Sequence, residues 1–211
     1  MHGPYSSNNS RRASPGLVAF SSSALIRLKS FLPPSWYASS PHKVRTTIPS
    51  GFVDGFPGWV VQVALVIDGK PKASAIFAPD IDLLYTAQEG AGAYCNGNKI
   101  SVSNTLNKKN ASICTGFPVR FNTQNNDEMQ NFWNLISPYA KVRMLGTAAI
   151  SLINVAKGSA DVYTEQSIML WDVAAGIAII EGSGGCIYSE KGPHEYSLNV
   201  FASNKPLFKY H

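Results

Sequence analysis

An aspartate that directly follows a tryptophan opens the most informative stretch of this chain. Asp172 precedes the largely apolar residues 173–180, and this run closes on the glycines at 182, 184 and 185. The pattern predicts a helix with a carboxylate at its N-terminal edge and a glycine stop. A carboxylate there either caps free backbone N–H groups or offers an oxygen to a cation beside the positive end of the helix dipole. The residue types alone leave both roles open.

Four blocks of sequence carry a family resemblance. Residues 165–185 resemble the C-terminal signature of the inositol monophosphatase family, W-D-x-A-A-G followed by a Glu and paired glycines, with slightly different spacing of the final Glu and glycines. Residues 51–66 look like the family's N-F-x-H-x-F-P segment, and residues 89–103 are similar to its G-x-G-A-x-x-N-G hairpin. Residues 143–149 resemble its R-x-x-G-[ST]-A-A turn, and the blocks follow the family's order.

This resemblance implies a fold, an activity and a set of site residues. The implied fold is α/β (α+β), the layered α-β-α-β-α sandwich of inositol monophosphatase and fructose bisphosphatase. The implied activity is Mg²⁺-dependent hydrolysis of a small phosphorylated substrate, an inositol phosphate or related sugar phosphate. By the same resemblance Asp172 is a metal ligand that also contacts the substrate, and Glu165 binds a substrate hydroxyl. The helix start at Gly146, Thr147 and Ala148 is implied to face the substrate.

Several of these residues also have a purely structural interpretation. Thr147 is a favourable N-cap whatever else it does, and Glu165 is equally interpretable as a solvated loop acid. Asp54 falls where the family has His or another polar residue, which makes it a candidate for a replacement metal ligand. No catalytic residue is assigned, since the sequence contains no nucleophile motif that joins His to a Ser or Cys.

The family's first metal motif, D-P-[IL]-D-G-T, is missing from its expected place. Counting back from Phe52, residues 44–49 read Val-Arg-Thr-Thr-Ile-Pro, and residues 1–53 contain no Asp or Glu. Pro49, in place of the motif's Thr, has no N–H to donate to a phosphate. Because a hard divalent cation needs about six oxygens, one remaining Asp is expected to bind Mg²⁺ weakly. The sequence therefore predicts the family fold, without its complete N-terminal helical layer, and little or no phosphatase activity.

A non-catalytic role is the alternative function. On that interpretation the chain is a pseudoenzyme that binds a phosphorylated polyol, or a dimerisation partner for an intact paralogue. Monomer and homodimer both stay open. No apolar run approaches the length of a membrane span, so no membrane partner is expected, and the predicted location is the cytoplasm.

Residues 1–50 differ from the rest in composition. They carry six basic residues, many serines and no acid, which leaves 12 basic against 13 acidic residues in the domain predicted for residues 51–211. The formal charge of +5 therefore belongs to this segment and indicates no nucleic-acid partner for the domain. Three interpretations of the segment compete: an organellar transit peptide, a disordered tail, or a piece foreign to the family from an altered reading frame, alternative exon or incomplete gene model. The abrupt end of the family match favours the third, and an organellar location would follow from the first.

Hydrophobic periodicity predicts the elements that must position these residues. Strands are expected at 59–67, 73–78, 83–87, 112–116, 141–144, 161–163, 186–188 and 199–202, with a hairpin at 93–99 whose return strand is 100–102. Helices are expected at 127–136, 148–157 and after Asp172, the first with Met129, Phe132, Trp133 and Ile136 on one face. Cys95, Cys114 and Cys186 lack a paired spacing and are expected to be reduced, mostly buried thiols.

Overall fold

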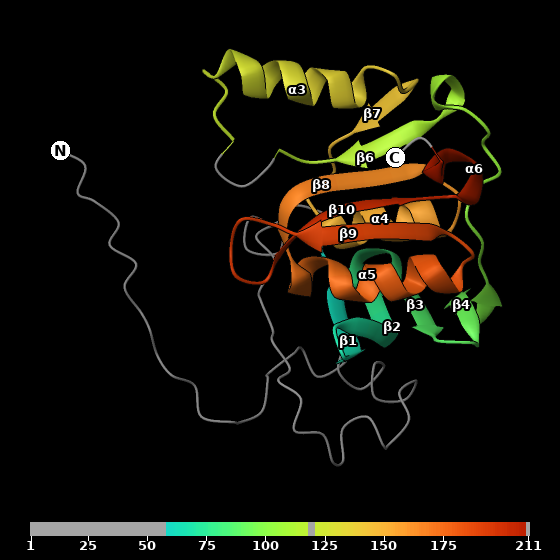
Figure 1. Ribbon diagram of the computed structural model, residues 1–211. Coiled ribbons are helices and arrows are strands. Elements are labelled where there is room, and N and C mark those ends of the chain that lie inside the picture. The colour runs from blue at the N-terminus through green and yellow to red at the C-terminus, as the bar shows by residue number, and fades with distance from the viewer. Residues whose placement is uncertain (1–57, 118–120, 210–211) are drawn as a thin grey trace.

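Two five-stranded sheets face each other across a pair of helices (Figure 1). The computed structural model describes residues 58–117 and 121–209. The first sheet is an antiparallel meander, which suits a chain of short strands joined by tight turns. Its strands, in spatial order, are β1 (Val61–Ile67), β2 (Lys70–Ala78), β3 (Leu83–Gln88), β4 (Gly92–Cys95) and β5 (Asn98–Lys99).

The second sheet is mixed, with the order β7-β6-β8-β10-β9. Its strands β6, β7 and β8 run parallel, while β10 is antiparallel to both β8 and β9. The parallel part matters for function, because the carboxyl ends of three strands meet at one edge. The bounds are β6 (Ser112–Thr115), β7 (Lys141–Arg143), β8 (Val162–Met169), β9 (Cys186–Lys191) and β10 (Ser197–Ser203).

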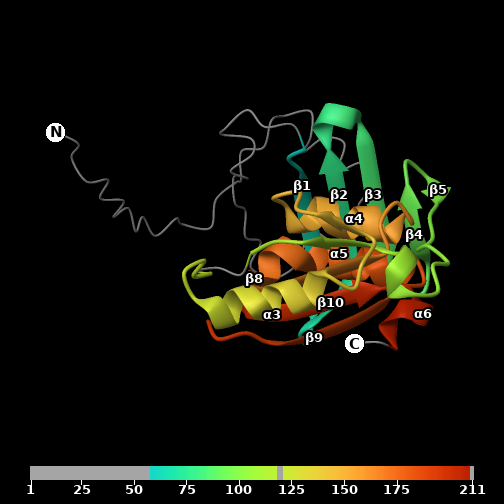
Figure 2. The ribbon, with the colours of Figure 1, turned by 90° about the horizontal axis from the view of Figure 1, so that it is seen from above.

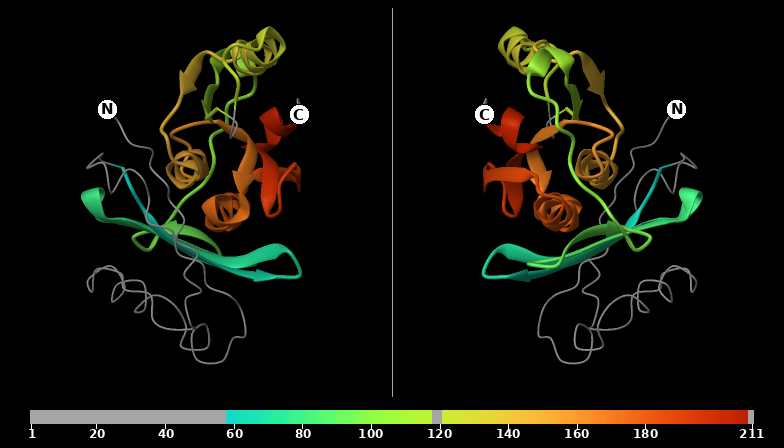
Figure 3. Two further views of the ribbon diagram at one scale, coloured as in Figure 1. Left: turned by 90° about the vertical axis from the view of Figure 1, so that its left-hand side faces the viewer. Right: turned by 90° about the vertical axis from the view of Figure 1, so that its right-hand side faces the viewer.

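The helices form two layers around these sheets. Helices α4 (Ala148–Ala156) and α5 (Leu170–Gly182) lie between the sheets, as Figures 1 and 3 show from different sides. Helices α3 (Asn126–Ile136) and α6 (Lys205–Phe208) lie beyond the second sheet, and two short 3-10 turns complete the described elements. The predicted layered α/β class is confirmed, and the N-terminal helical layer falls outside the described residues.

Helix α5 is the centre of the packing. All of its residues from Val173 to Ile180 are buried, and the helix contacts strands of both sheets. At Gly176 it crosses α4 so closely that a Cβ would lie 2.4 Å from Cδ1 of Leu152. At Gly182 a Cβ would meet the backbone of Gly92 in β4 at 3.0 Å. Two glycines thus allow this helix to fit between α4 and the first sheet.

A buried carboxylate holds the start of the parallel strands in register. Asp161, just before β8, accepts hydrogen bonds from the Ser112 backbone N–H at 2.7 Å and the Ser103 hydroxyl at 2.6 Å. Burial alone would raise the pKa of Asp161, but the bonds from Ser103 and Ser112 lower it below its ordinary value. The Asn204 amide donates to the carbonyl of Ser103 at 3.0 Å, which ties the crossing between the sheets to the end of β10.

The element predictions hold with instructive exceptions. The expected return strand at 100–102 is wrong, because β4 returns at once through the Asn96-Gly97 turn into β5. Strand β8 extends to Met169, six residues beyond its predicted end, and α6 was not predicted. Cys95, Cys114 and Cys186 are free, as expected, although Cys114 alone is fully buried. In the described part of the chain no helix is both long and apolar enough to cross a membrane.

The crossing of α4 and α5 generates a stability prediction. Replacing Gly176 by Ala adds a methyl group against Leu152, and we expect a loss of about 1–3 kcal/mol in the free energy of unfolding despite the better helix propensity of Ala. Urea unfolding followed by circular dichroism measures it. In a Leu152→Ala background the penalty of Gly176→Ala should shrink, because the crowding side-chain atoms are gone. Equal penalties in both backgrounds would contradict the contact as its cause.

Candidate functional site

The carboxyl ends of the parallel strands bring several predicted site residues to one edge. Cys114 in β6 pairs with Arg143 in β7 on one side and with Tyr163 in β8 on the other. Two residues further along, Gly116 lies level with Glu165, and the chain after β7 reaches Gly146. Ligands of open α/β sheets bind outside the carboxyl ends of parallel strands. The register therefore places Glu165 and the turn at Gly146 at the edge where such a ligand is expected.

Glu165 lies on strand β8, so its interpretation as a solvated loop acid is wrong. Its Oε2 accepts a hydrogen bond from the Tyr163 hydroxyl at 3.0 Å, and its carboxylate lies directly over Gly116, where a Cβ would be 3.1 Å from Oε1. Burial raises the pKa of Glu165 to about 7; the Tyr163 bond opposes that rise and the charge of Asp172 adds to it. This carboxyl therefore changes its charge near neutral pH.

Asp172 lies in the first turn of α5 but does not cap it. The helix begins at Leu170 with Met169 at the N-cap, so the capping interpretation, one of the two that the sequence left open for Asp172, is wrong. Burial raises the pKa of Asp172, and its charge also raises the pKa values of Glu165 and Tyr163. The charge of Asp172 thus acts on both other side chains, and we refer to the two carboxyls and the phenol together as the cluster at the start of α5.

Gly146, Thr147 and Ala148 form the entry into helix α4. Gly146 has a φ of 70°, the left-handed conformation that glycine adopts without strain. Thr147 occupies the N-cap position as predicted, but its side chain makes no capping hydrogen bond. Ala148 is the first helical residue. Because α4 and α5 both begin near the carboxyl ends of the parallel strands, the positive ends of two helix dipoles lie at this edge, an arrangement that favours an anion.

Two further polar residues have buried side-chain atoms without a hydrogen-bond partner. Gln62 of β1 donates from Nε2 to the main-chain carbonyl of Asp172 at 3.3 Å, while its Oε1 is buried without a hydrogen-bond partner. Ser167 has a φ of 59°, an uncommon conformation for a residue with a side chain, and its buried hydroxyl also lacks a partner. Both are features of functional sites, where strain and unsatisfied polar groups concentrate.

The described donors do not make a complete metal site. Among residues 58–117 and 121–209, no three His, Cys, Asp or Glu side chains lie close enough together to hold a metal ion. Glu165 and Asp172 supply two carboxylates and Gln62 one amide oxygen, fewer than the six or so oxygens that Mg²⁺ requires. Asp54 and residues 44–49 lie outside the described residues. Weak metal binding therefore stays a prediction.

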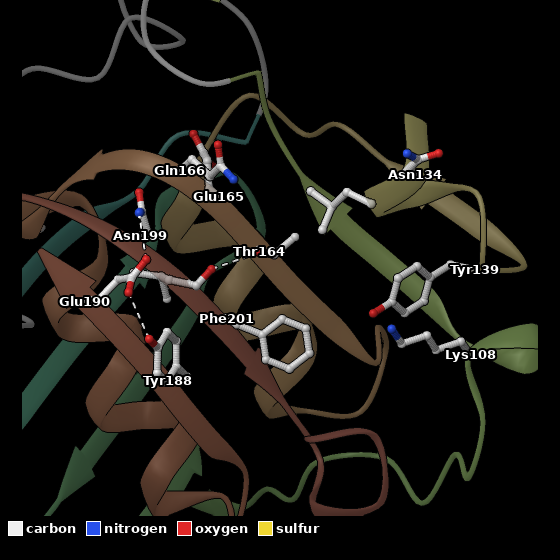
Figure 4. A pocket seen from close by; sticks show the side chains of 12 residues that line it. Lys108, Asn134, Tyr139, Thr164, Glu165, Gln166, Tyr188, Glu190, Asn199 and Phe201 are labelled. Carbon is white, nitrogen blue, oxygen red and sulfur yellow. Dashed lines mark hydrogen bonds between the residues drawn. The ribbon is translucent and has the colours of Figure 1, made fainter. Parts of the chain in front are cut away.

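A separate pocket of about 300 Å³ lies on the opposite face of the second sheet (Figure 4). Figure 4 shows Lys108 and Tyr139 at one end and Tyr188, Glu190 and Asn199 at the other. Glu190 accepts hydrogen bonds from the Asn199 amide at 3.0 Å and the Tyr188 hydroxyl at 2.9 Å. Glu165 contributes to its lining, but Asp172 and the turn at 146–148 do not.

A comparison with family sequence profiles decides the assignment. The profile described as the inositol monophosphatase family matches residues 49–206, about three quarters of the chain. The chain belongs to the inositol monophosphatase family. The match begins at the point where the sequence blocks begin, and it includes every described residue of the cluster at the start of α5.

Relatives and solved structures agree with this membership. The chain is 37% identical over 143 residues to the Nus factor SuhB of Xylella fastidiosa, covering 68% of this chain and 52% of that protein. It is 32% identical over 159 residues to the fructose-1,6-bisphosphatase/inositol-1-monophosphatase of Aquifex aeolicus, covering 75% and 60%. An inositol monophosphatase structure from Anabaena superposes with a TM-score of 0.67 at 30% identity, covering 76% and 67%. The chain thus spans about half to three fifths of the length of these two relatives.

Sequence reasoning missed Tyr163, Gly116 and Gln62 as neighbours of the site. Tyr163 could have been found, because residues two apart on a strand share a face and it precedes Glu165 by two. Gly116 and Gln62 approach from other strands, and only the register of the sheets reveals them.

The raised pKa of Glu165 predicts a pH-dependent stability. The folded pKa of about 7 lies above an unfolded value near 4.5, so the stability that the neutral carboxyl provides is complete below about 4.5 and is lost as the pH rises through 7. Glu165→Gln keeps an acceptor for the Tyr163 hydroxyl. Because the amide does not ionise, the variant should not lose stability as the pH rises through 7. We expect the variant to exceed the parent by about 2 kcal/mol at pH 8 and by far less at pH 5, measured by urea unfolding. A difference that does not vary with pH, or the same gain from replacing the exposed Glu195 by Gln, would contradict it.

Proposed function

We propose that this chain binds a small phosphorylated polyol at the cluster of Glu165, Asp172 and the turn at 146–148, with hydrolysis that is weak or absent. The observation that carries the proposal is the position of two half-buried carboxyls, with Glu165 on β8 over Gly116 beyond the end of β6, and Asp172 in the first turn of α5. Membership of the family suggests the phosphatase activity and the Mg²⁺ dependence in this proposal. The substrate class, an inositol phosphate or related sugar phosphate, rests on the same grounds.

Each residue of the cluster has a proposed role. Glu165, held by Tyr163, accepts a hydrogen bond from a hydroxyl of the polyol ring. The backbone N–H groups at the start of α4, presented by Gly146, Thr147 and Ala148, receive the phosphate. Asp172 offers its carboxylate to a divalent cation, which when bound neutralises phosphate charge. With two carboxylates among the described donors, we expect Mg²⁺ to bind too weakly to support turnover.

Binding and hydrolysis separate in one experiment. Titration calorimetry of the full chain with inositol 1-phosphate should show binding, and phosphate release with Mg²⁺ present should stay near background. Glu165→Gln should weaken binding by roughly 3- to 20-fold, because the amide accepts less strongly than a carboxylate. Glu181→Gln, at the C-terminal end of helix α5 and away from the cluster, is the matched control and should bind like the parent.

Two results would overturn the proposal. If the parent chain does not bind inositol 1-phosphate, the proposed binding role is wrong. Robust Mg²⁺-dependent hydrolysis that Asp172→Asn abolishes removes the claim of weak activity, and it would point to recruited ligands such as Asp54.

Restoring the missing motif tests why activity is weak. Residues 44–49, Val-Arg-Thr-Thr-Ile-Pro, are replaced by Asp-Pro-Ile-Asp-Gly-Thr in the full chain. Two added carboxylates should raise Mg²⁺ affinity at least tenfold, measured by calorimetry, even if turnover stays low. The same replacement with Asn at both Asp positions is the control. Unchanged Mg²⁺ affinity would show that lost ligands at these positions are not the cause.

The second candidate function is non-catalytic. A relative at 37% identity is named a Nus factor, which is not a hydrolase name, and this favours a role in association with other molecules. On this proposal the chain pairs with an intact paralogue or with a second copy of itself, while the polyol site is secondary. We place the chain in the cytoplasm, with an organelle as the alternative if residues 1–50 act as a transit peptide.

A further inference from the structure

The pocket on the face of the second sheet that α3 covers is separate from the polyol cluster. It lies between the last turn of α3 and strands β8, β9 and β10, and Figure 2 shows α3 alongside β10 and β9. Its volume of about 300 Å³ is at the lower end of the range for small-molecule sites. We call it the outer-sheet pocket, and Figure 4 shows the twelve described residues that line it.

One end of the outer-sheet pocket holds a fixed carboxylate. The two oxygens of Glu190 accept one hydrogen bond each, from the Asn199 amide at 3.0 Å and from the Tyr188 hydroxyl at 2.9 Å. Asn199 is itself anchored, because its Oδ1 accepts from the Ser167 backbone N–H at 3.0 Å, where β8 and β10 change register. A carboxylate oxygen accepts from more than one donor, so Glu190 can also receive N–H groups of a ligand.

The other end of the pocket carries a cation. Lys108 lies in the 3-10 turn Lys108–Asn110 just before β6, and its Nζ is 5.5 Å from the centroid of the buried Tyr139 ring. An ammonium has three N–H donors and can bind a carboxylate while it contacts a ring face. Figure 4 shows Lys108 and Tyr139 at the end opposite Glu190. The pocket therefore offers a positive charge at one end and a negative charge at the other.

The middle of the pocket combines apolar surface with amide groups. Figure 4 shows Thr164 and Phe201 between the two charged ends. Phe201 and Leu135 supply apolar surface, and the side chains of Asn134 and Gln166 supply amides. Each side-chain amide both donates and accepts hydrogen bonds, as the backbone of a peptide does. The lining thus suits a ligand that has amide bonds and an apolar group between two charged ends.

The separation of the two ends sets the length of the ligand. Strand β10 lies between β9 and β8, and neighbouring strands are about 4.8 Å apart, so Glu190 on β9 is roughly 10 Å across the sheet from β8. Lys108 lies beyond β8, beside the start of β6, and both long side chains shorten the gap. An extended peptide spans about 3.3–3.6 Å per residue, so about two or three residues can reach both ends. A free amino acid cannot, because its ammonium and carboxylate share one carbon.

We propose that the outer-sheet pocket binds a short peptide of about two or three residues through both of its free termini. The peptide ammonium meets Glu190, its carboxylate meets Lys108, and its amide bonds and one apolar side chain lie between them. The inference goes beyond the proposed polyol site and does not depend on it. Glu165 has no part in it, because its carboxylate accepts from the Tyr163 hydroxyl and lies over Gly116.

Titration calorimetry of the full chain with the tripeptide Gly-Leu-Gly tests the proposal. The parent chain should bind the tripeptide with a saturable signal. Acetylation of the peptide N-terminus and amidation of its C-terminus should each weaken binding by roughly fivefold or more, because each removes a charge that one end of the pocket recognises. Free leucine should bind at least about tenfold more weakly, since it can meet only one end at a time.

Variants assign each terminus to its end of the pocket. Glu190→Gln should weaken binding of the free tripeptide and leave the affinity for the acetylated form unchanged, whereas Lys108→Met should do the same for the amidated form. The neighbouring Lys109→Met and Glu195→Gln change side chains outside the lining, so they are the matched controls and should bind like the parent. Circular dichroism confirms that each variant is folded.

Several results would overturn the proposal. These are a folded parent chain that does not bind the tripeptide, equal affinity for the free and the capped peptides, and free leucine that binds as tightly as the tripeptide. A loss in Lys109→Met equal to that in Lys108→Met would also contradict it. All four variants lie outside the polyol cluster, so binding of inositol 1-phosphate, measured in parallel, reports on the proposed function alone.

Discussion

The position of helix α5 between two sheets is the constraint on which the rest of the structure depends. Eight consecutive buried residues leave this helix no freedom to slide or rotate, and Gly176 fixes how closely α4 crosses it. Because Asp172 lies in the first turn of this helix, the packing of the following residues sets the place of its backbone. The Ser74 hydroxyl adds to this packing a 2.9 Å hydrogen bond to the Ala175 carbonyl.

The second sheet supplies the other half of the arrangement. In a strictly antiparallel sheet the carboxyl ends of successive strands lie alternately at the two ends of the sheet. Strands β6, β7 and β8 are parallel, so their carboxyl ends lie at the same end, together with the helix starts that follow β7 and β8. Asp161 holds the opposite, amino-terminal end of these strands in register. Gly116 then lets the Glu165 carboxylate lie over the chain, since any side chain there would push it away. Sheet topology, a buried hydrogen bond and one glycine together position a single carboxyl.

Much of the fold was predictable from the sequence, because the pattern of apolar residues along the chain indicates which segments are buried. The longer strands of the first sheet are largely apolar segments bounded by turn residues such as Asp68-Gly69, and the run after Asp172 is apolar, so these segments predicted their elements. The errors have physical causes. The strand expected at 100–102 failed because the Asn96-Gly97 turn completes the hairpin within two residues. The sequence also left open whether Asp172 caps its helix, and the structure excludes that role because the helix starts two residues earlier, at Leu170. Neighbours such as Gln62, which bonds to the Asp172 carbonyl from a distant strand, depend on tertiary register that no local pattern encodes.

Under the proposed function, electrostatics gives a reason why the cluster suits binding better than turnover. Burial raises the pKa of Glu165 to about 7, and the charge of Asp172 adds to that rise. When Glu165 is neutral, the cluster carries one negative charge beside two helix N-termini, and a phosphate can approach with little repulsion. When both are ionised, a phosphate needs a cation to come between them, and the described donors are too few to hold one strongly. Under the proposed function, a shortage of metal ligands would therefore weaken catalysis more than recognition, because the helix ends and the hydroxyl acceptor belong to the fold itself, whereas hydrolysis also requires the charge of a bound cation.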